Sequence, residues 1–131
     1  MNREIKFRGK RIDNGEWVYG DLLQPTEICD IYEIANCKSI DGTRYEVIPE
    51  TIGQFTEMYD KYNCEIYVGD IVDVTKPCIE ERGVIVSKKG CFFIKSNEIL
   101  LPLYLCKPNN YKIKIRGNIT DNPELLGGED E

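Results

Sequence analysis

Two aspartates, Asp21 and Asp70, are the residues whose type and repetition most suggest chemistry. Each follows a glycine in a repeated phrase: "EWVYGDLL" (16–23) and "EIYVGDIV" (65–72) both contain a glutamate, three strand-forming residues, Gly-Asp and two aliphatic residues. A carboxylate pair could serve a glycosidase or hold the metal of a nuclease. The same pattern suits a structural corner, where glycine permits the turn and aspartate accepts hydrogen bonds from nearby amides.

The rest of the sequence favours the corner over catalysis. The chain contains no histidine, so the usual general base and the usual partner of a cysteine nucleophile are both absent. It also lacks a Gly-x-Ser-x-Gly elbow and a phosphate-binding glycine loop. We therefore predict a non-enzymatic protein without catalytic residues, in which Gly20, Asp21, Gly69 and Asp70 form structural turns.

Six cysteines raise the question of disulfides or a metal site. They are spaced too widely for the close pairs that bind zinc. The N-terminus lacks the apolar core of a signal peptide, and no apolar run approaches the ~20 residues that span a bilayer, so we expect a cytoplasmic protein with reduced thiols. We expect no metal and no cofactor, with disulfides as the main alternative, and we expect Cys91 and Cys106 to pack in the core. The cysteines are Cys29, Cys37, Cys64, Cys78, Cys91 and Cys106.

Composition and charge limit the class of protein. At 131 residues, with 41% hydrophobic and 31% charged residues, the chain is typical of one globular domain. Its net charge of −6 disfavours a general nucleic-acid binder. We predict a single β-rich domain over residues 1–126, which could form two lobes at about 1–50 and 51–126, followed by an acidic tail at 127–131.

Alternation of apolar and polar residues with a period of two predicts strands throughout the chain. It is clearest in "EIKFRGK" (4–10) and "YKIKIRG" (111–117), whose lysines and arginines should face outward. Asp41-Gly42 predicts one hairpin turn, and Gly90 predicts another within residues 82–95. Trp17 should be largely buried in its strand.

Helical signals are scarce by comparison. Pro102 favours an extended or edge segment over residues 97–105, and Asn122-Pro123 predicts about one helical turn near the C-terminus. We therefore predict a mainly β fold, either all-β or α+β with little helix. It would form a small, partly open antiparallel β-barrel or sheet, and could include an SH3-like lobe.

Three segments, in order, carry a family resemblance: "REIKFRGKRIDNGEWVYGDLL" (3–23), "VIPETIGQFTEMYDKYNCEIYVGDIV" (47–72) and "GNITDNPELL" (117–126). Together they resemble the YopX family of bacteriophage and prophage proteins over nearly the whole chain. Asn63 stands in place of the family's turn glycine, but asparagine also tolerates the left-handed conformation. Val68 stands where the family often has an acidic residue. The resemblance implies a phage or prophage origin and a β-rich fold, and it supplies no activity.

The first functional interpretation is an accessory protein that binds a host or phage protein, or a second copy of itself. The chain contains eight tyrosines, and "YDKYNCEIY" places Tyr59, Tyr62 and Tyr67 around one turn. Tyrosine provides a large contact area at low entropic cost, which suits interfaces. These rings could also simply pack on the fold.

The second interpretation is a small nucleic-acid-binding β-barrel that uses the basic terminal strands. Pairing of these strands would gather a patch of seven cations, whereas the rest of the chain is acidic and would repel a polyanion. We favour the first interpretation, and we expect no membrane partner. The patch consists of Lys6, Arg8, Lys10, Arg11, Lys112, Lys114 and Arg116.

Overall fold

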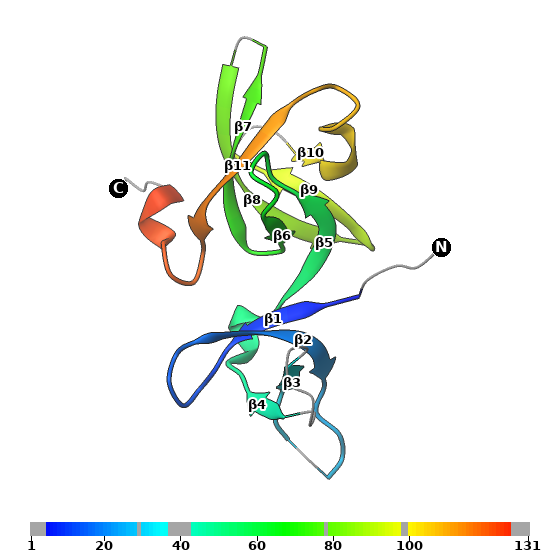
Figure 1. The fold of residues 1–131 in the computed structure, drawn as a ribbon, viewed down its shortest axis with the longest axis vertical. Coiled ribbons are helices and arrows are strands. Elements are labelled where there is room, and N and C mark those ends of the chain that lie inside the picture. Colours follow the sequence, from blue (N-terminus) through cyan, green and yellow to red (C-terminus); the bar gives the residue numbers. More distant parts are fainter. Residues whose placement is uncertain (1–4, 29, 37–42, 78, 98–99, 127–131) are drawn as a thin grey trace. The chain divides into compact units, whose positions relative to one another are not determined.

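The computed structural model describes residues 5–28, 30–36, 43–77, 79–97 and 100–126, and all structural statements below concern these residues. The chain divides into an N-terminal unit, Met1–Phe55, and a C-terminal unit, Thr56–Glu131. Its described part contains eleven strands, three short 3-10 turns and no α-helix (Figure 1). The strands form two antiparallel sheets that are not closed into a barrel, so the mainly β prediction is confirmed. Among the described residues, no helix has the length and apolar character to cross a membrane.

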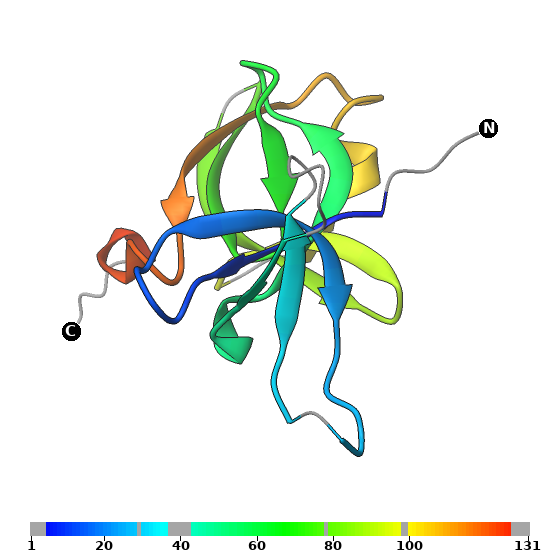
Figure 2. The same ribbon diagram turned by 60° about the horizontal axis from the view of Figure 1, so that its bottom comes forward.

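The N-terminal unit is one sheet with the strand order β4-β3-β2-β1-β5. Strands β2 and β3 run side by side and antiparallel (Figure 2). Val18, Ile34 and Val47 form its buried core, because alternate residues of each strand point to one face. The elements are β1 (Phe7–Lys10), β2 (Trp17–Leu23), β3 (Glu33–Asn36), β4 (Arg44–Glu46), the 3-10 turn η1 (Pro49–Thr51) and the beginning of β5 (Gly53–Tyr59).

The outward face expected for Arg8 is wrong, because Arg8 is only 7% exposed. Trp17 is of intermediate exposure, so most of its surface is buried. Val18 and Gly20 take the core side of β2, so the period of two places Trp17 on the opposite face. There the guanidinium of Arg8 lies 4.8 Å from the centre of the Trp17 ring, a cation–π contact.

The C-terminal unit contains a second sheet, with the strand order β10-β9-β8-β7-β11 (Figure 1). Its core is built from Val72, Val74, Ile85, Ile94 and Ile113 and includes residues outside this sheet as well. The elements are the end of β5, β6 (Glu65–Tyr67) next to it, β7 (Asp70–Lys76), β8 (Ile79–Lys88), β9 (Cys91–Lys95), β10 (Leu100–Pro102), β11 (Lys112–Asn118) and the 3-10 turns η2 (Leu103–Leu105) and η3 (Pro123–Leu126).

Several local predictions can be compared with this sheet. The hairpin at Gly90 is confirmed, with φ +82° at that glycine between β8 and β9. Cys106 is buried as expected, but Cys91 is exposed beside the hairpin turn, so its core assignment is wrong. Strands β3 and β4 pair as the turn at Asp41-Gly42 requires. That turn, Cys29, Cys37, Cys78 and the tail 127–131 lie outside the described residues.

The repeated phrase adopts two different structures. Gly69 has φ +98° between β6 and β7, and the carboxylate of Asp70, only 2% exposed, accepts a 2.8 Å hydrogen bond from the Tyr67 amide. Gly20 and Asp21 instead lie inside β2, so the turn predicted there is wrong. Gly20 is paired with β1 on one side and β3 on the other, and these two ladders keep the chain extended.

This difference predicts unequal losses when the two aspartates are truncated. Asp70→Ala leaves the buried Tyr67 amide without its acceptor and should lower the free energy of unfolding by about 1–3 kcal/mol, measured with urea. Asp21→Ala, on an exposed side chain, should change it by less than about 0.5 kcal/mol. Asp70→Asn should be milder than Asp70→Ala, since an amide oxygen still accepts the bond. Equal losses at both positions would contradict this assignment.

Candidate functional site

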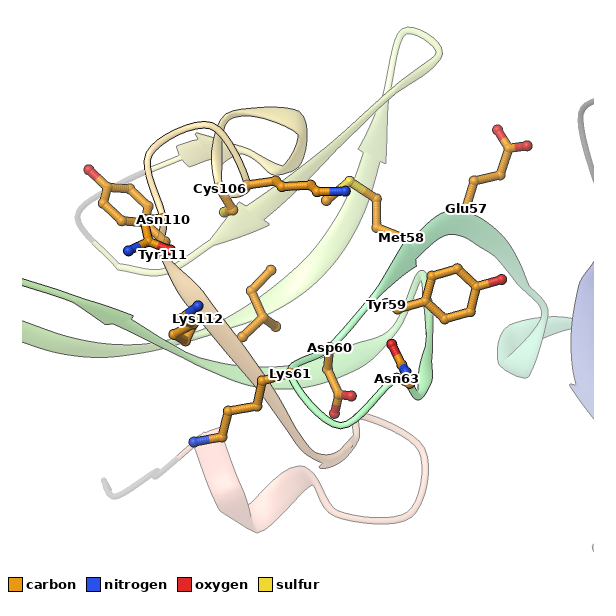
Figure 3. A pocket seen from close by; sticks show the side chains of 12 residues that line it. Glu57, Met58, Tyr59, Asp60, Lys61, Asn63, Cys106, Asn110, Tyr111 and Lys112 are labelled. Atoms are coloured by element: carbon orange, nitrogen blue, oxygen red, sulfur yellow. The ribbon is translucent and has the colours of Figure 1, made fainter. Parts of the chain in front are cut away.

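A groove of about 450 Å³ lies in the C-terminal unit, between the turn that follows β5 and the loop that leads into β11 (Figure 3). One wall is formed by residues of the segment 57–63 and the other by residues of the segment 106–113. Its volume falls within the range of about 300–1,000 Å³ that ligand sites usually occupy.

The floor of the groove is apolar. Met58, Cys106 and Ile113 line it, and Cys106 and Ile113 are 1% and 5% exposed members of the core. Burial raises the pKa of the Cys106 thiol, and the charge of Lys76 only partly opposes this shift. The thiol is therefore a neutral packing group rather than a thiolate nucleophile.

The rim of the groove is polar and carries more positive than negative charge. Lys61, Lys107 and Lys112 line it and are all exposed. Glu57 is the exposed carboxylate of the lining, whereas the other lining carboxylate, Asp60, is only 7% exposed. Two aromatic rings complete the lining, Tyr59 at 48% exposure and the half-buried Tyr111.

The first wall is held in place by the buried carboxylate of Asp60. Its Oδ1 accepts hydrogen bonds from the amides of Tyr62 and Cys64, both at 2.9 Å. Its Oδ2 accepts one from the amide of Ile115, on β11, at 3.3 Å. The amide of Lys61 also donates to the Ile113 carbonyl at 2.8 Å, so the turn is fixed to β11.

The second wall is a compact backbone turn. The amide of Tyr111 donates to the Cys106 carbonyl at 2.8 Å, and that of Asn110 donates to the Lys107 carbonyl at 3.0 Å. Both walls are thus tied down by hydrogen bonds within the chain. A site with such walls loses little conformational freedom when a ligand binds.

Left-handed backbone conformations concentrate along this groove. Glu57, Asn63 and Asn110 line it and have φ of +67°, +66° and +61°, and the remaining non-glycine example among the described residues is Lys89. The left-handed conformation inferred for Asn63, which replaces a glycine of the resembled family, is confirmed. Such conformations are costly for residues with a side chain and tend to collect at functional sites.

The three tyrosines predicted as contact residues lie in different environments. Tyr59 lines the groove, and Tyr62, on the adjoining turn, is 61% exposed with Lys61 5.3 Å from its ring centre. Tyr67 is 2% exposed and donates its hydroxyl proton to Glu65 at 2.8 Å. The interface role predicted for Tyr67 is therefore wrong, because its ring is part of the interior.

The basic patch predicted from the terminal strands does not form by strand pairing. Strand β1 pairs with β2 and β5, whereas β11 pairs with β7 in the other sheet. In the N-terminal unit the cations lie against aromatic rings: Lys6 lies 5.1 Å from Phe55 and Arg8 lies against Trp17. Arg11 forms an ion pair with Asp13 at 2.6 Å, and Lys10 lies 5.8 Å from the Trp17 ring.

The basic residues of β11 have separate environments as well. Lys112 lines the groove, but Arg116 lies 3.6 Å from the carboxylate of Asp73, and Lys114 is the cross-strand neighbour of Asp73. Asp73 also accepts two hydrogen bonds from Arg82, at 2.7 and 3.1 Å. The Arg82 guanidinium holds the pKa of Asp73 below its ordinary value, with help from Arg116 and Lys114.

Sequence reasoning missed the second wall of the groove and its lysine, Lys107. The signal was present in "KPNNYK" (107–112), since a proline followed by two asparagines is typical of a turn. Asp60 lies in the turn that Tyr59 and Tyr62 flank, and its bond to Ile115 spans 55 residues of sequence, beyond any local pattern. Within the described ranges, no cluster of three or more histidine, cysteine or carboxylate side chains could hold a metal ion.

The Asp73–Arg82 pair makes a prediction about acid stability. A carboxyl group whose pKa is lowered on folding stabilises the fold above its unfolded pKa, near 3.8, and loses this effect as the pH falls through its folded pKa. Unfolding free energies measured with urea from pH 6 to pH 2.5 should therefore fall more steeply for the wild type than for Asp73→Asn. Parallel curves for the two proteins would exclude the pair as a source of acid sensitivity.

The left-handed turn at Asn63 makes a second prediction. Asn63→Ala places a residue that disfavours positive φ at +66° and should lower the free energy of unfolding by about 1 kcal/mol. Asn63→Gly accepts this conformation freely and should be neutral or slightly stabilising. Thermal unfolding followed by circular dichroism measures both variants. An alanine variant as stable as the glycine variant would show that the conformation costs nothing.

Comparison with known proteins places the chain in a family. The model of the YopX family, described as "YopX protein", matches residues 6–127, nearly the whole chain. The crystal structure of protein EF1440 from Enterococcus faecalis is similar, with a TM-score of 0.64 and 23% sequence identity, over 96% of this chain and 100% of that chain. This likeness shows a shared fold. No curated protein matches the sequence. The chain belongs to the YopX family.

Proposed function

We propose that this protein is a non-enzymatic binding module that holds a host or phage protein in the groove of its C-terminal unit. The observation that carries the proposal is a groove with fixed walls, an apolar floor and a lysine-bearing rim. The proposal includes a phage or prophage origin, in keeping with the family, and action in the cytoplasm of a bacterial cell.

The anatomy of the groove supports recognition of a protein partner. Interfaces combine a desolvated apolar centre with a polar rim, and a few residues, mostly tryptophan, tyrosine and arginine, contribute most of the binding energy. Here the floor around Met58 and Ile113 offers the apolar centre, Tyr59 offers an aromatic anchor, and the lysines form the polar rim. Because the walls are already ordered, binding requires little further ordering of the backbone.

The titratable groups of the groove support binding over catalysis. The Cys106 thiol has a raised pKa and lies in the core. The Asp60 carboxylate already accepts three backbone amide bonds, which leaves it little capacity to act as a base. The chain contains no histidine that could activate either group.

Nucleic acid has less support as the partner. The cations of residues 6–11 lie against aromatic rings or carboxylates of their own unit, and Arg116 lies against Asp73. The partner protein could also be a second copy of this chain. In that case the mass of the complex is twice the mass of the chain.

Site-specific photo-crosslinking tests the proposal. Tyr59 is replaced by p-benzoylphenylalanine, which keeps an aromatic ring on the groove, and Lys88, exposed at the end of β8 and outside the groove lining, carries the same replacement as a control. Irradiation in phage-infected cells should join the Tyr59 variant to one discrete protein and should give no such product with the Lys88 variant. Adding Lys112→Glu should reduce that product several-fold. Identical products at both positions, or none at either, would contradict a groove-bound partner.

A further inference from the structure

We infer that the groove recognises an acidic peptide segment that carries one apolar anchor residue. In this assignment the rim lysines bind carboxylates, and the floor receives an aliphatic or aromatic side chain. The inference rests on the proposed function and adds the chemical class of the ligand to it.

The charges around the groove select for an anion. Lys61 and Lys112 come from the two different walls (Figure 3). Lys107, between Cys106 and Asn110 in the sequence, also lines the groove. Lys76 adds a fourth cation nearby, 5.8 Å from the Tyr111 ring, although it is also paired with Glu81 at 3.3 Å. Against these, Asp60 is buried under its amide bonds, so Glu57 is the exposed negative charge of the lining. An incoming carboxylate therefore meets a locally positive rim.

The apolar floor of the groove favours a ligand that carries an apolar side chain next to its carboxylates. Cys106 and Ile113 belong to the hydrophobic core and still line the groove, and Met58 packs against the same core. Filling this floor with a leucine or an aromatic side chain removes apolar surface from water on both partners. Methionine adapts its shape to different apolar groups, so more than one kind of anchor residue fits.

The same features disfavour a nucleic acid as the ligand. Single strands are bound along grooves whose cations follow the phosphate backbone over several nucleotides. Here three exposed lysines, Lys61, Lys107 and Lys112, share one groove of about 450 Å³, whereas the chain as a whole has a net charge of −6, which disfavours a long polyanion. A short peptide places its carboxylates within this one groove and extends little beyond it.

Fluorescence anisotropy with labelled probes tests the ligand class. The first probe is a nine-residue peptide with a central tryptophan between glutamates and aspartates. The second replaces the tryptophan by serine, the third replaces every acidic residue by lysine, and the fourth is a nine-nucleotide oligothymidine. The first probe should bind at least about tenfold more tightly than each of the others, and raising the salt from 50 to 500 mM should weaken it about 3–10-fold.

Charge-reversal variants locate the binding. The double variant Lys107→Glu/Lys112→Glu should weaken the acidic tryptophan probe at least tenfold and should strengthen the lysine probe. Lys88→Glu, at an exposed lysine outside the groove lining, should change neither by more than about twofold. Both altered lysines of the double variant are exposed, and far-ultraviolet circular dichroism checks that it is folded.

Each outcome has one meaning. Equal binding of the serine probe would remove the apolar anchor from the inference, and tighter binding of the oligothymidine would replace the peptide by nucleic acid. A loss with Lys88→Glu equal to that of the double variant would show that binding is not in the groove. If Tyr59 crosslinks a protein while the acidic probe fails to bind, the ligand class is wrong and the binding module stands. If both experiments fail, both proposals are wrong.

Discussion

A single buried carboxylate, that of Asp60, holds the candidate site together. Two of its three amide donors lie in its own turn, and the third lies on β11, 55 residues further along the chain. A carboxylate removed from water is costly unless its oxygens accept hydrogen bonds, and here backbone groups provide them. The turn and β11 are therefore energetically coupled, since separating them leaves a buried charge with fewer donors. One wall of the groove depends directly on this interaction.

The C-terminal unit contains several buried acids, so part of the chain's negative charge does not lie on its surface. Asp70 accepts the Tyr67 amide at the corner before β7, and Asp73 is bound by Arg82 across the sheet. Together with Asp60, these are the acids at or below 7% exposure among the described residues of this unit. Their charges are directed inward at amides and a guanidinium. Because these carboxylates are withdrawn from the surface, the exposed rim of one groove can be locally basic on a chain whose net charge is −6.

Local patterns predicted the class of the fold and several of its turns. The strand at 111–117 and the turn at Gly90 depend mainly on local sequence. The structure contains β11 and the β8–β9 hairpin at these places. The errors arose where tertiary context decides. The similar phrases around Gly20 and Gly69 give a continuous strand in one case and a corner in the other, because only Gly20 has ladder partners on both sides. Their shared pattern of Glu, three strand-forming residues and Gly-Asp does not distinguish these two outcomes.

The candidate site was predictable only in its separate parts, for the same reason. Tyr59 and Lys112 were identified as binding residues from composition and alternation, but their shared groove depends on contacts far apart in sequence. The residues with positive φ show how local preference and tertiary contacts combine. Asn63 and Asn110 are residue types that accept positive φ, so local chemistry permits both turns, whereas Glu57 does not favour it. The conformation of Glu57 must therefore be imposed by its surroundings, which include the Thr56 hydroxyl that accepts the Met58 amide at 3.2 Å and donates to the Ile66 carbonyl at 2.8 Å. The groove is thus shaped by tertiary packing at Glu57 and by local turns at Asn63 and Asn110. The chemistry of the groove follows from the side chains that line it.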